Sequence, residues 1–139
     1  MSEGNWSFET AARTLWQEAR GETGEGRAAV AHVLWNRLRT RRWGTTLAGV
    51  CLAPLQFSGW NAHDPNRMAA AELADSDPVL GACRAVLAAA ERAADPTAGA
   101  LYYYALSIPP PLWSKRMSPA GRFGNQRFYR ERDPSTGSG

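Results

Sequence analysis

The sequence holds few of the residues that bind metal ions or act as nucleophiles. It contains only two histidines and two cysteines in 139 residues. No HxxE, HExxH or CxxC spacing occurs, which argues against a zinc amidase or peptidase. No GxSxG elbow is present, and neither cysteine stands in a context that pairs it with a histidine. We therefore expect neither a metal ion nor a cofactor.

Long hydrophobic stretches are also missing. The longest apolar segment, residues 79–90, is interrupted by Gly81 and Arg84 and is too short to cross a membrane. The first five residues lack the basic and apolar regions of a secretory signal, so we expect a protein made in the cytoplasm that does not insert into the membrane. Cys51 and Cys83 lie among apolar neighbours, and we expect buried free thiols rather than a disulfide.

Charge of either sign is moderate. The 16 basic and 13 acidic residues give a net charge of +3, which is compatible with an anionic polymer but indicates none in particular. The densest basic cluster spans residues 37–42, in the last turn of a predicted helix, where the helix dipole favours cations. A small basic module that binds nucleic acid or another anionic polymer through this cluster stays open as an alternative.

Apolar residues at helical spacing predict a mainly helical domain without internal repeats or linkers. Ser7 is a candidate N-cap for the first helix, and Asp77-Pro78 is a strong start for the last one. The second helix is apolar on more than one side, so we expect it at the centre of the core, with His32 as a packing or surface residue. The predicted helical segments are 8–19, 25–41, 47–51, 67–73 and 78–94.

The C-terminal third has a different character. Residues 99–105 have strand composition, and alternation places Tyr102 and Tyr104 on one face and Tyr103 on the other. A second short strand within 121–129 is expected to pair with the first. The predicted fold class is α+β, predominantly α, with a small antiparallel β element in this third of the chain.

Glu18 is the most informative single residue. At about 100° per residue it falls on the flank of the apolar stripe of the first helix, just before Gly21 ends that helix. A carboxyl group that is half removed from water tends to keep its proton near neutral pH, which suits a proton donor. A surface ion pair with a neighbouring arginine is the alternative reading of the position.

Aromatic residues are abundant, with six Trp and four Tyr. Aromatic faces stack on the apolar faces of sugar rings, so a groove lined by Trp and Tyr suits a polysaccharide, although core packing explains Trp16 and Trp35 equally well.

Several motifs, in order, resemble the SleB/CwlJ-type cell wall hydrolase family, which includes spore-cortex-lytic enzymes and phage endolysin-like members. They extend over about residues 8 to 130. One departure is Gln126, where the family's last motif usually has His. The matching segments are Glu18-Ala19-Arg20-Gly21-Glu22, Ala29-Val30-Ala31-His32-Val33-Leu34-Trp35-Asn36-Arg37, Gln56-Phe57-Ser58, Asp95 to Tyr104, Trp113, and Phe123-Gly124-Asn125-Gln126-Arg127-Phe128-Tyr129.

The resemblance implies a lysozyme-like catalytic domain over residues 1–132, followed by a disordered polar tail at 133–139. It implies a lytic transglycosylase of the phage endolysin kind. We expect this enzyme to act as a monomer on peptidoglycan glycan strands after release from the host cytoplasm and to bind no nucleic acid. The family's catalytic glutamate maps to Glu18. The residues expected to bind substrate are Glu22, Gln56, Phe57, Ser58, Tyr102, Tyr104 and Trp113.

Two roles stay open for Glu22. It can tie the turn after the first helix to Arg20 or Arg27, which we favour. If it is instead a second catalytic acid, a muramidase that uses water becomes the better description. We also expect Gln56, Tyr102 and Tyr104 to line the cleft near Glu18, with Phe57 and Tyr103 packed beneath them.

Overall fold

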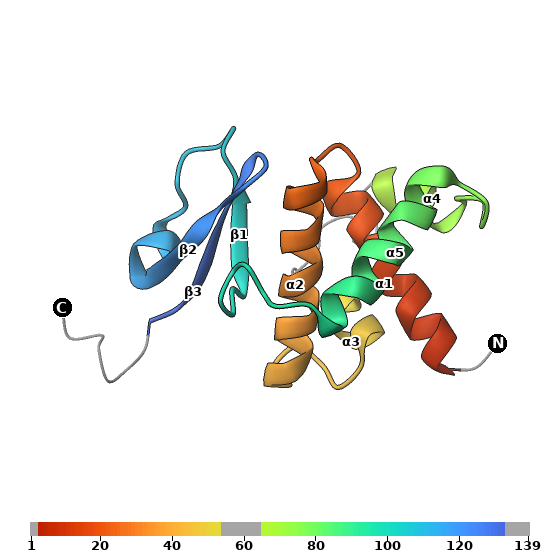
Figure 1. Cartoon of the computed structure of the whole chain (residues 1–139), viewed down its shortest axis with the longest axis horizontal. Helices are drawn as coiled ribbons and strands as arrows, with labels where there is room; N and C mark the ends of the chain where they lie inside the picture. Colours follow the sequence, from red (N-terminus) through yellow and green to blue (C-terminus); the bar gives the residue numbers. More distant parts are fainter. Residues whose placement is uncertain (1–2, 54–64, 133–139) are drawn as a thin grey trace.

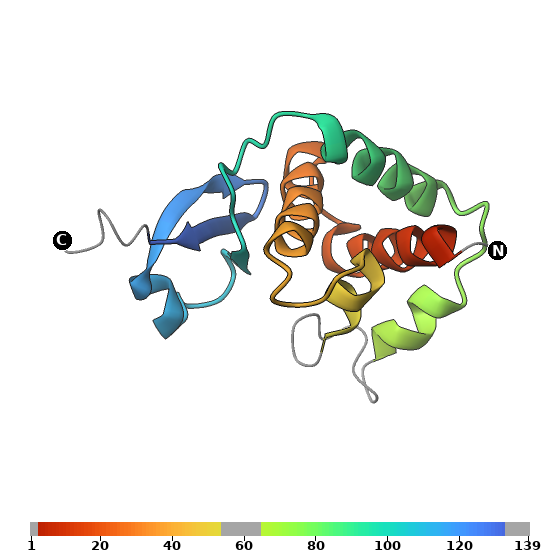
Figure 2. The ribbon, with the colours of Figure 1, turned by 90° about the horizontal axis from the view of Figure 1, so that it is seen from below.

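The computed structural model describes residues 3–53 and 65–132, and this part of the chain forms an α+β fold in which helices predominate (Figure 1). The sheet lies beside α2, with α1 and α5 on the other side of that helix (Figure 2). The predicted fold class is confirmed. The elements are α1 (Glu3–Ala19), α2 (Gly24–Thr40), α3 (Leu47–Leu52), α4 (Pro65–Ala71), α5 (Pro78–Arg92), β1 (Tyr102–Ala105), the 3₁₀-helix η2 (Leu112–Arg116), β2 (Met117–Phe123) and β3 (Gln126–Glu131).

The helix α2 is the centre of the core, as its apolar character predicted. Every residue from Ala29 to Arg37 is buried, because α1, α3, α5 and the sheet all pack against it. Burial of a helix on all sides requires that most of its residues be apolar. The exceptions, His32, Asn36 and Arg37, therefore each need a specific partner.

Of the helix caps expected from the sequence, Asp77 is confirmed and Ser7 is wrong. Thr46 and Asp77 cap α3 and α5 by accepting hydrogen bonds from backbone N–H groups three residues on. Ser7 does not cap α1, which begins four residues earlier. Its hydroxyl instead accepts a hydrogen bond from the N–H of Ala48, at 2.8 Å, and so joins α1 to the first turn of α3.

The sheet has three antiparallel strands in the order β1-β3-β2. The second strand predicted by the sequence is β3, which pairs with β1 so that Tyr103 lies opposite Phe128. The strand β2 was missed, because its composition is not that of a strand. It is an edge strand that contains Pro119 and has a register shift after it, and an edge is where a strand tolerates proline.

Both cysteines are buried free thiols, as expected. Burial raises the pKa of Cys51 to about 12. An unfolded chain releases the same proton near pH ~8.5.

Stability should therefore fall as the pH rises from about 8.5 to about 12, by about 5 kcal/mol at most, because only the folded protein retains the Cys51 proton in that window. Urea unfolding at several alkaline pH values, compared between the wild type and Cys51→Ala, measures this effect. The variant should show the shallower pH dependence. Parallel curves for the two proteins would contradict the assignment to Cys51.

Candidate active site

Glu18 is the penultimate residue of α1, and its side chain is half-buried, as its flank position predicted. The hydroxyl of Tyr103 in β1 donates a hydrogen bond to Oε1 of Glu18 at 2.6 Å. This contact joins the C-terminal end of the first helix to the first strand, across 85 residues of sequence. It fixes the carboxyl group relative to the sheet.

Tyr103 is itself held by the core of the sheet. Its ring packs against Phe128 with the centroids 5.4 Å apart. Burial raises the pKa of Tyr103 well above its usual range, the nearby charge of Glu18 and the hydrogen bond to it add to the rise, and Arg37 opposes it. The phenol is therefore protonated at neutral pH and stays a hydrogen-bond donor to Glu18.

The tyrosines of β1 alternate between the two faces as predicted. Tyr102 and Tyr104 both contact Trp113, at centroid distances of 5.6 and 6.1 Å. Tyr104 is buried and stacks on Tyr129. These contacts place the two tyrosines with Trp113 on one side of the sheet.

The face that meets Glu18 is the opposite of the expected one. Tyr103, which we expected to pack beneath the site, reaches Glu18 with its hydroxyl while its ring packs on Phe128. Alternation fixes which side chains share a face, but the packing of α1 on the sheet decides which face Glu18 meets. The expectation that Tyr104 lines the cleft beside Glu18 is wrong, because its ring is enclosed by Tyr129 and Trp113.

A pocket of about 370 Å³ adjoins the contact between Glu18 and Tyr103. Its lining combines three aromatic rings, a cation and a thioether. The lining residues are Arg37, Tyr102, Tyr103, Trp113 and Met117. Flat aromatic walls with one strong hydrogen-bond donor are typical of a site for a ring that has apolar faces and polar edges.

Arg37 and Met117 line the pocket but were not among the site residues expected from the sequence, and Arg37 is the charged one. Its guanidinium is buried, donates from Nε to the carbonyl oxygen of Leu101 at 2.8 Å, and lies 4.6 Å from the centre of the Trp43 ring. Burial lowers its pKa, and the nearby Tyr103, Tyr102, Cys51 and Glu18 raise it. The sequence carried a signal, since Arg37 continues the apolar stripe of Val30 at a spacing of seven residues.

Glu22 binds the hairpin between β2 and β3. Its Oε1 accepts a hydrogen bond from the backbone N–H of Asn125 at 2.8 Å. The expected arginine partner is wrong, because Arg27 donates to the carbonyl oxygens of Ala19 and Arg20 instead.

The hairpin comes so close to Glu22 that it needs glycine at its turn. Gly124 has a φ of +61°, and a Cβ on it would lie 2.5 Å from Oε1 of Glu22. The two carboxyl groups at the end of α1 therefore both contact the sheet, Glu18 at β1 and Glu22 at the hairpin.

The loop before β1 is held to α2 by Asp95. One carboxylate oxygen accepts from the N–H and the hydroxyl of Thr97, and the other accepts from Asn36 and from the N–H of Gly99. Asn36 also donates to the carbonyl oxygen of Ala100. This clamp sets the direction in which the chain enters β1 and so positions Tyr103.

The remaining candidate residues differ in what the structure says of them. Gln56, Phe57 and Ser58 lie outside the described residues, as does the predicted tail at 133–139. Gln126 is buried at the start of β3, on the same face as Phe128. His32 is a packing residue, with Nδ1 3.7 Å from Asp95.

The described residues contain no group of three or more His, Cys, Asp or Glu side chains that could hold a metal ion. Within the same ranges, no helix is long and apolar enough to cross a membrane.

Comparison with known proteins adds a family and a fold. The sequence model of a family described as Cell Wall Hydrolase matches residues 21–129, a range that begins just after Glu18. A spore cortex-lytic enzyme of Bacillus subtilis (strain 168) is 34% identical over 97 residues, which cover 67% of this chain but only 27% of that protein. The chain thus spans little more than a quarter of this relative's length.

Two solved structures are similar to the fold. The catalytic domain of the Bacillus cereus SleB protein has a TM-score of 0.75 and 22% sequence identity, with 93% of each chain covered. The catalytic domain of a germination-specific lytic transglycosylase, SleB from Bacillus anthracis, has a TM-score of 0.70 and 23% identity, with 94% of this chain and 97% of that chain covered.

Proposed function

The chain belongs to the cell wall hydrolase family, and on this premise we propose that it cleaves the glycan backbone of peptidoglycan between N-acetylmuramic acid and N-acetylglucosamine. We propose further that it does so as a lytic transglycosylase, with Glu18 as the catalytic acid. The observation that carries the proposal is the half-buried carboxyl group of Glu18, which is fixed by a hydrogen bond from Tyr103, a residue that lines an aromatic pocket.

The reaction needs one carboxyl group acting twice. Glu18 gives its proton to the glycosidic oxygen as the bond from that oxygen to C1 of the muramic acid breaks. The carboxylate then takes the proton of the 6-hydroxyl of the same sugar, and the oxygen of that hydroxyl bonds to C1 to close a 1,6-anhydro ring. The internal hydroxyl is already near C1, so no second carboxylate has to position a water molecule.

Tyr103 acts as a positioning residue in this scheme. Its hydroxyl donates to Oε1 of Glu18 and so fixes the orientation of the carboxyl group that exchanges the proton. The rings of Tyr102 and Trp113 offer surfaces on which a sugar can stack, and Arg37 offers N–H groups to the polar substituents of that sugar.

Tyr103→Phe should lower kcat by about tenfold and change KM little, because the lost hydrogen bond orients the acid rather than the sugar. Tyr104→Phe is the matched control, since it removes the same atom from a ring on the other face of β1. Initial rates at increasing peptidoglycan concentrations separate kcat from KM. Equal losses in the two variants would contradict the role of Tyr103.

A muramidase that uses water is the alternative, and it requires a second carboxylate. Glu22 is the described candidate, but its Oε1 is engaged by the hairpin. This contact supports a structural role and disfavours the alternative.

Glu22→Gln should retain activity within about threefold of the wild type, because a glutamine oxygen can still accept from the N–H of Asn125. The rate of dye release from labelled peptidoglycan measures it. A loss of about a hundredfold or more would make Glu22 a second catalytic acid and favour the muramidase.

We also propose that the protein acts as a monomer and, in the manner of a phage endolysin, reaches the wall only after release from the cytoplasm. Cells that express it should stay intact until their membrane is permeabilised and then lyse. Lysis without permeabilisation would contradict this part of the proposal.

Turbidity of a suspension of purified peptidoglycan tests the proposed activity directly. The wild type should clear the suspension, and a module that only binds would leave the turbidity unchanged. Unchanged turbidity together with tight binding would contradict the proposed activity and would show that the protein is a non-catalytic wall-binding protein.

A further inference from the structure

The positive charge of the chain is concentrated on the sheet. Residues 96–132 contain six basic residues and a single acidic one, whereas the rest of the chain holds ten basic and twelve acidic residues. All six cations are exposed, and we call them the basic sheet surface. They are Lys115, Arg116, Arg122, Arg127, Arg130 and Arg132.

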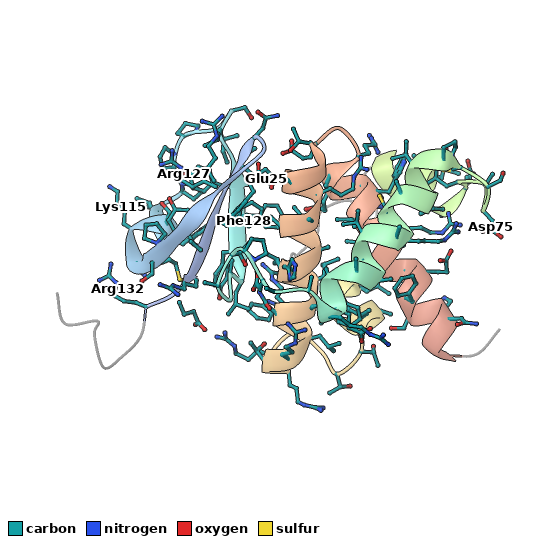
Figure 3. All side chains as sticks on the ribbon, viewed as in Figure 1. Glu25, Asp75, Lys115, Arg127, Phe128 and Arg132 are labelled. Atoms are coloured by element: carbon teal, nitrogen blue, oxygen red, sulfur yellow. The ribbon has the colours of Figure 1, made fainter. Side chains whose placement is uncertain are left out.

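The described residues provide no ion-pair partner for this surface. The acidic residue of the sheet, Glu131, pairs with Arg42 at the end of α2. None of the six cations forms a salt bridge within residues 3–53 and 65–132. Figure 3 shows Lys115, Arg127 and Arg132 around the sheet, at the opposite end of the molecule from Asp75.

Two of these cations form a like-charge pair across neighbouring strands. Arg122 and Arg127 are directly opposite each other on β2 and β3, and like charges in such a pair destabilise a sheet. The Nε–H of Arg122 donates to the carbonyl oxygen of Gly124 at 3.2 Å. Binding of a ligand explains the presence of this destabilising pair more simply than a structural role does.

Part of the basic sheet surface adjoins residues of the aromatic pocket. Lys115 and Arg116 lie between Trp113 and Met117, which both line the pocket. Arg127 is opposite Tyr104 in the sheet, and the ring of Tyr104 contacts Trp113. If one sugar of a polymer bound in the pocket, the groups attached to the sugars of that polymer would lie close to these cations.

We propose that the basic sheet surface binds the carboxylate groups of the peptide stems borne by the glycan strand whose sugar occupies the pocket. Each muramic acid carries such a stem through its lactyl group, and guanidinium groups match carboxylates in geometry as well as in charge. The inference rests on the proposed function, because it takes the strand in the pocket to be peptidoglycan.

Binding by the catalytically inactive Glu18→Gln protein tests this inference without turnover. Two substrates are compared after removal of all phosphate polymers: glycan strands that retain their peptide stems, and the same strands freed of stems by an amidase. Sedimentation gives the affinity for each. When Arg122→Gln and Arg127→Gln are both introduced into the Glu18→Gln protein, its binding to the stem-bearing strands should weaken by about fivefold. Its binding to the stem-free strands should not change.

Two further readouts belong to the same experiment. The difference between the two substrates should shrink as salt is raised from about 0.1 M to about 1 M, since the Debye length falls from about 10 to about 3 Å. The melting temperature of the double variant should equal or exceed that of its parent, because the like-charge pair is gone. Arg92→Gln is the matched control for Arg127→Gln alone. It removes an exposed cation from the last turn of α5 and should leave binding unchanged.

Three results would overturn the inference. One is equal affinity of the double variant and its parent for stem-bearing strands. Another is an equal loss on stem-free strands. The third is a loss seen only when phosphate polymers are left on the wall, which would make a phosphate polymer the partner. Failure of the wild type to clear peptidoglycan would overturn the proposed function instead, while the binding comparison would keep its meaning.

Discussion

Replacing Glu18 with glutamine should abolish glycan cleavage, with a loss in kcat of about a hundredfold or more. The amide is nearly the same size as the acid and can still accept the hydrogen bond from Tyr103 at its oxygen. It cannot donate a proton to the glycosidic oxygen or take one from the 6-hydroxyl. The loss should appear in turnover and not in binding, because the proton is needed in the transition state.

The control for this variant is its fold and its affinity for the wall. The melting temperature and the amount of protein that sediments with peptidoglycan should both match the wild type. Retention of more than about a tenth of the wild-type rate in a well-folded Glu18→Gln protein would remove Glu18 from the role of catalytic acid.

Asp95→Ala should cost about 3 kcal/mol or more of folding stability, which is a large part of what a domain of this size possesses. Four donors lose their acceptor, and two of the residues that supply them, Asn36 and Thr97, are buried. Asp95→Asn should cost less, because the amide keeps one accepting oxygen and only the other oxygen is replaced, by an NH2 group. Urea unfolding of the three proteins measures the order, and equal stabilities would contradict the clamp.

The clamp also predicts how stability depends on acid. Burial raises the pKa of Asp95, but hydrogen bonds from Thr97, Asn36 and Gly99 outweigh burial and lower it. The stability that this ion contributes is therefore present above the unfolded pKa of about 3.9 and is lost as the pH falls through the lower folded pKa. In Asp95→Ala this acid-dependent part should disappear.

His32 affects folding stability in a higher range of pH than Asp95 does. Burial lowers its pKa, and the charge of Asp95 opposes the shift. The neutral imidazole is thus favoured in the fold, and its contribution is present above about pH 6.5 and lost as the pH falls through the folded pKa. Without the charge of Asp95, this loss should grow.

The helices could be predicted because their patterns are local. Apolar spacing and capping residues such as Asp77 depend on neighbours within a few positions, and the structure confirms α2 as the central helix and α5 as capped by Asp77. The flank position of Glu18 is of the same kind, since helical geometry alone places it half-buried.

The errors concern contacts between distant segments. Alternation paired Tyr102 with Tyr104 correctly but could not tell that Tyr103 meets Glu18, because the packing of α1 on the sheet sets that contact. A nearby arginine was expected to donate to Glu22, whereas the donor is the backbone N–H of Asn125 in the hairpin, 103 residues away. Ser7 looked like a cap because its use by α3 depends on the fold.

Arg37 could have been identified from the sequence, because it is a charged residue on the apolar stripe of a predicted core helix. A cation on the apolar stripe of a buried helix must have an acceptor and a reason to be there. Its acceptor is the carbonyl oxygen of Leu101, and it lines the aromatic pocket. The same question asked of each charged residue in a predicted core would have placed Arg37 among the candidates.

The chemical form of the released sugar ends tests the central claim most directly. Peptidoglycan digested by the wild type is treated with borohydride, and the muropeptides are analysed by mass spectrometry. A reaction completed by Glu18 and the internal 6-hydroxyl gives 1,6-anhydro-muramic acid ends, which have no aldehyde and resist reduction. Quantitative reduction of the released ends would show that water had been the nucleophile and would contradict the account.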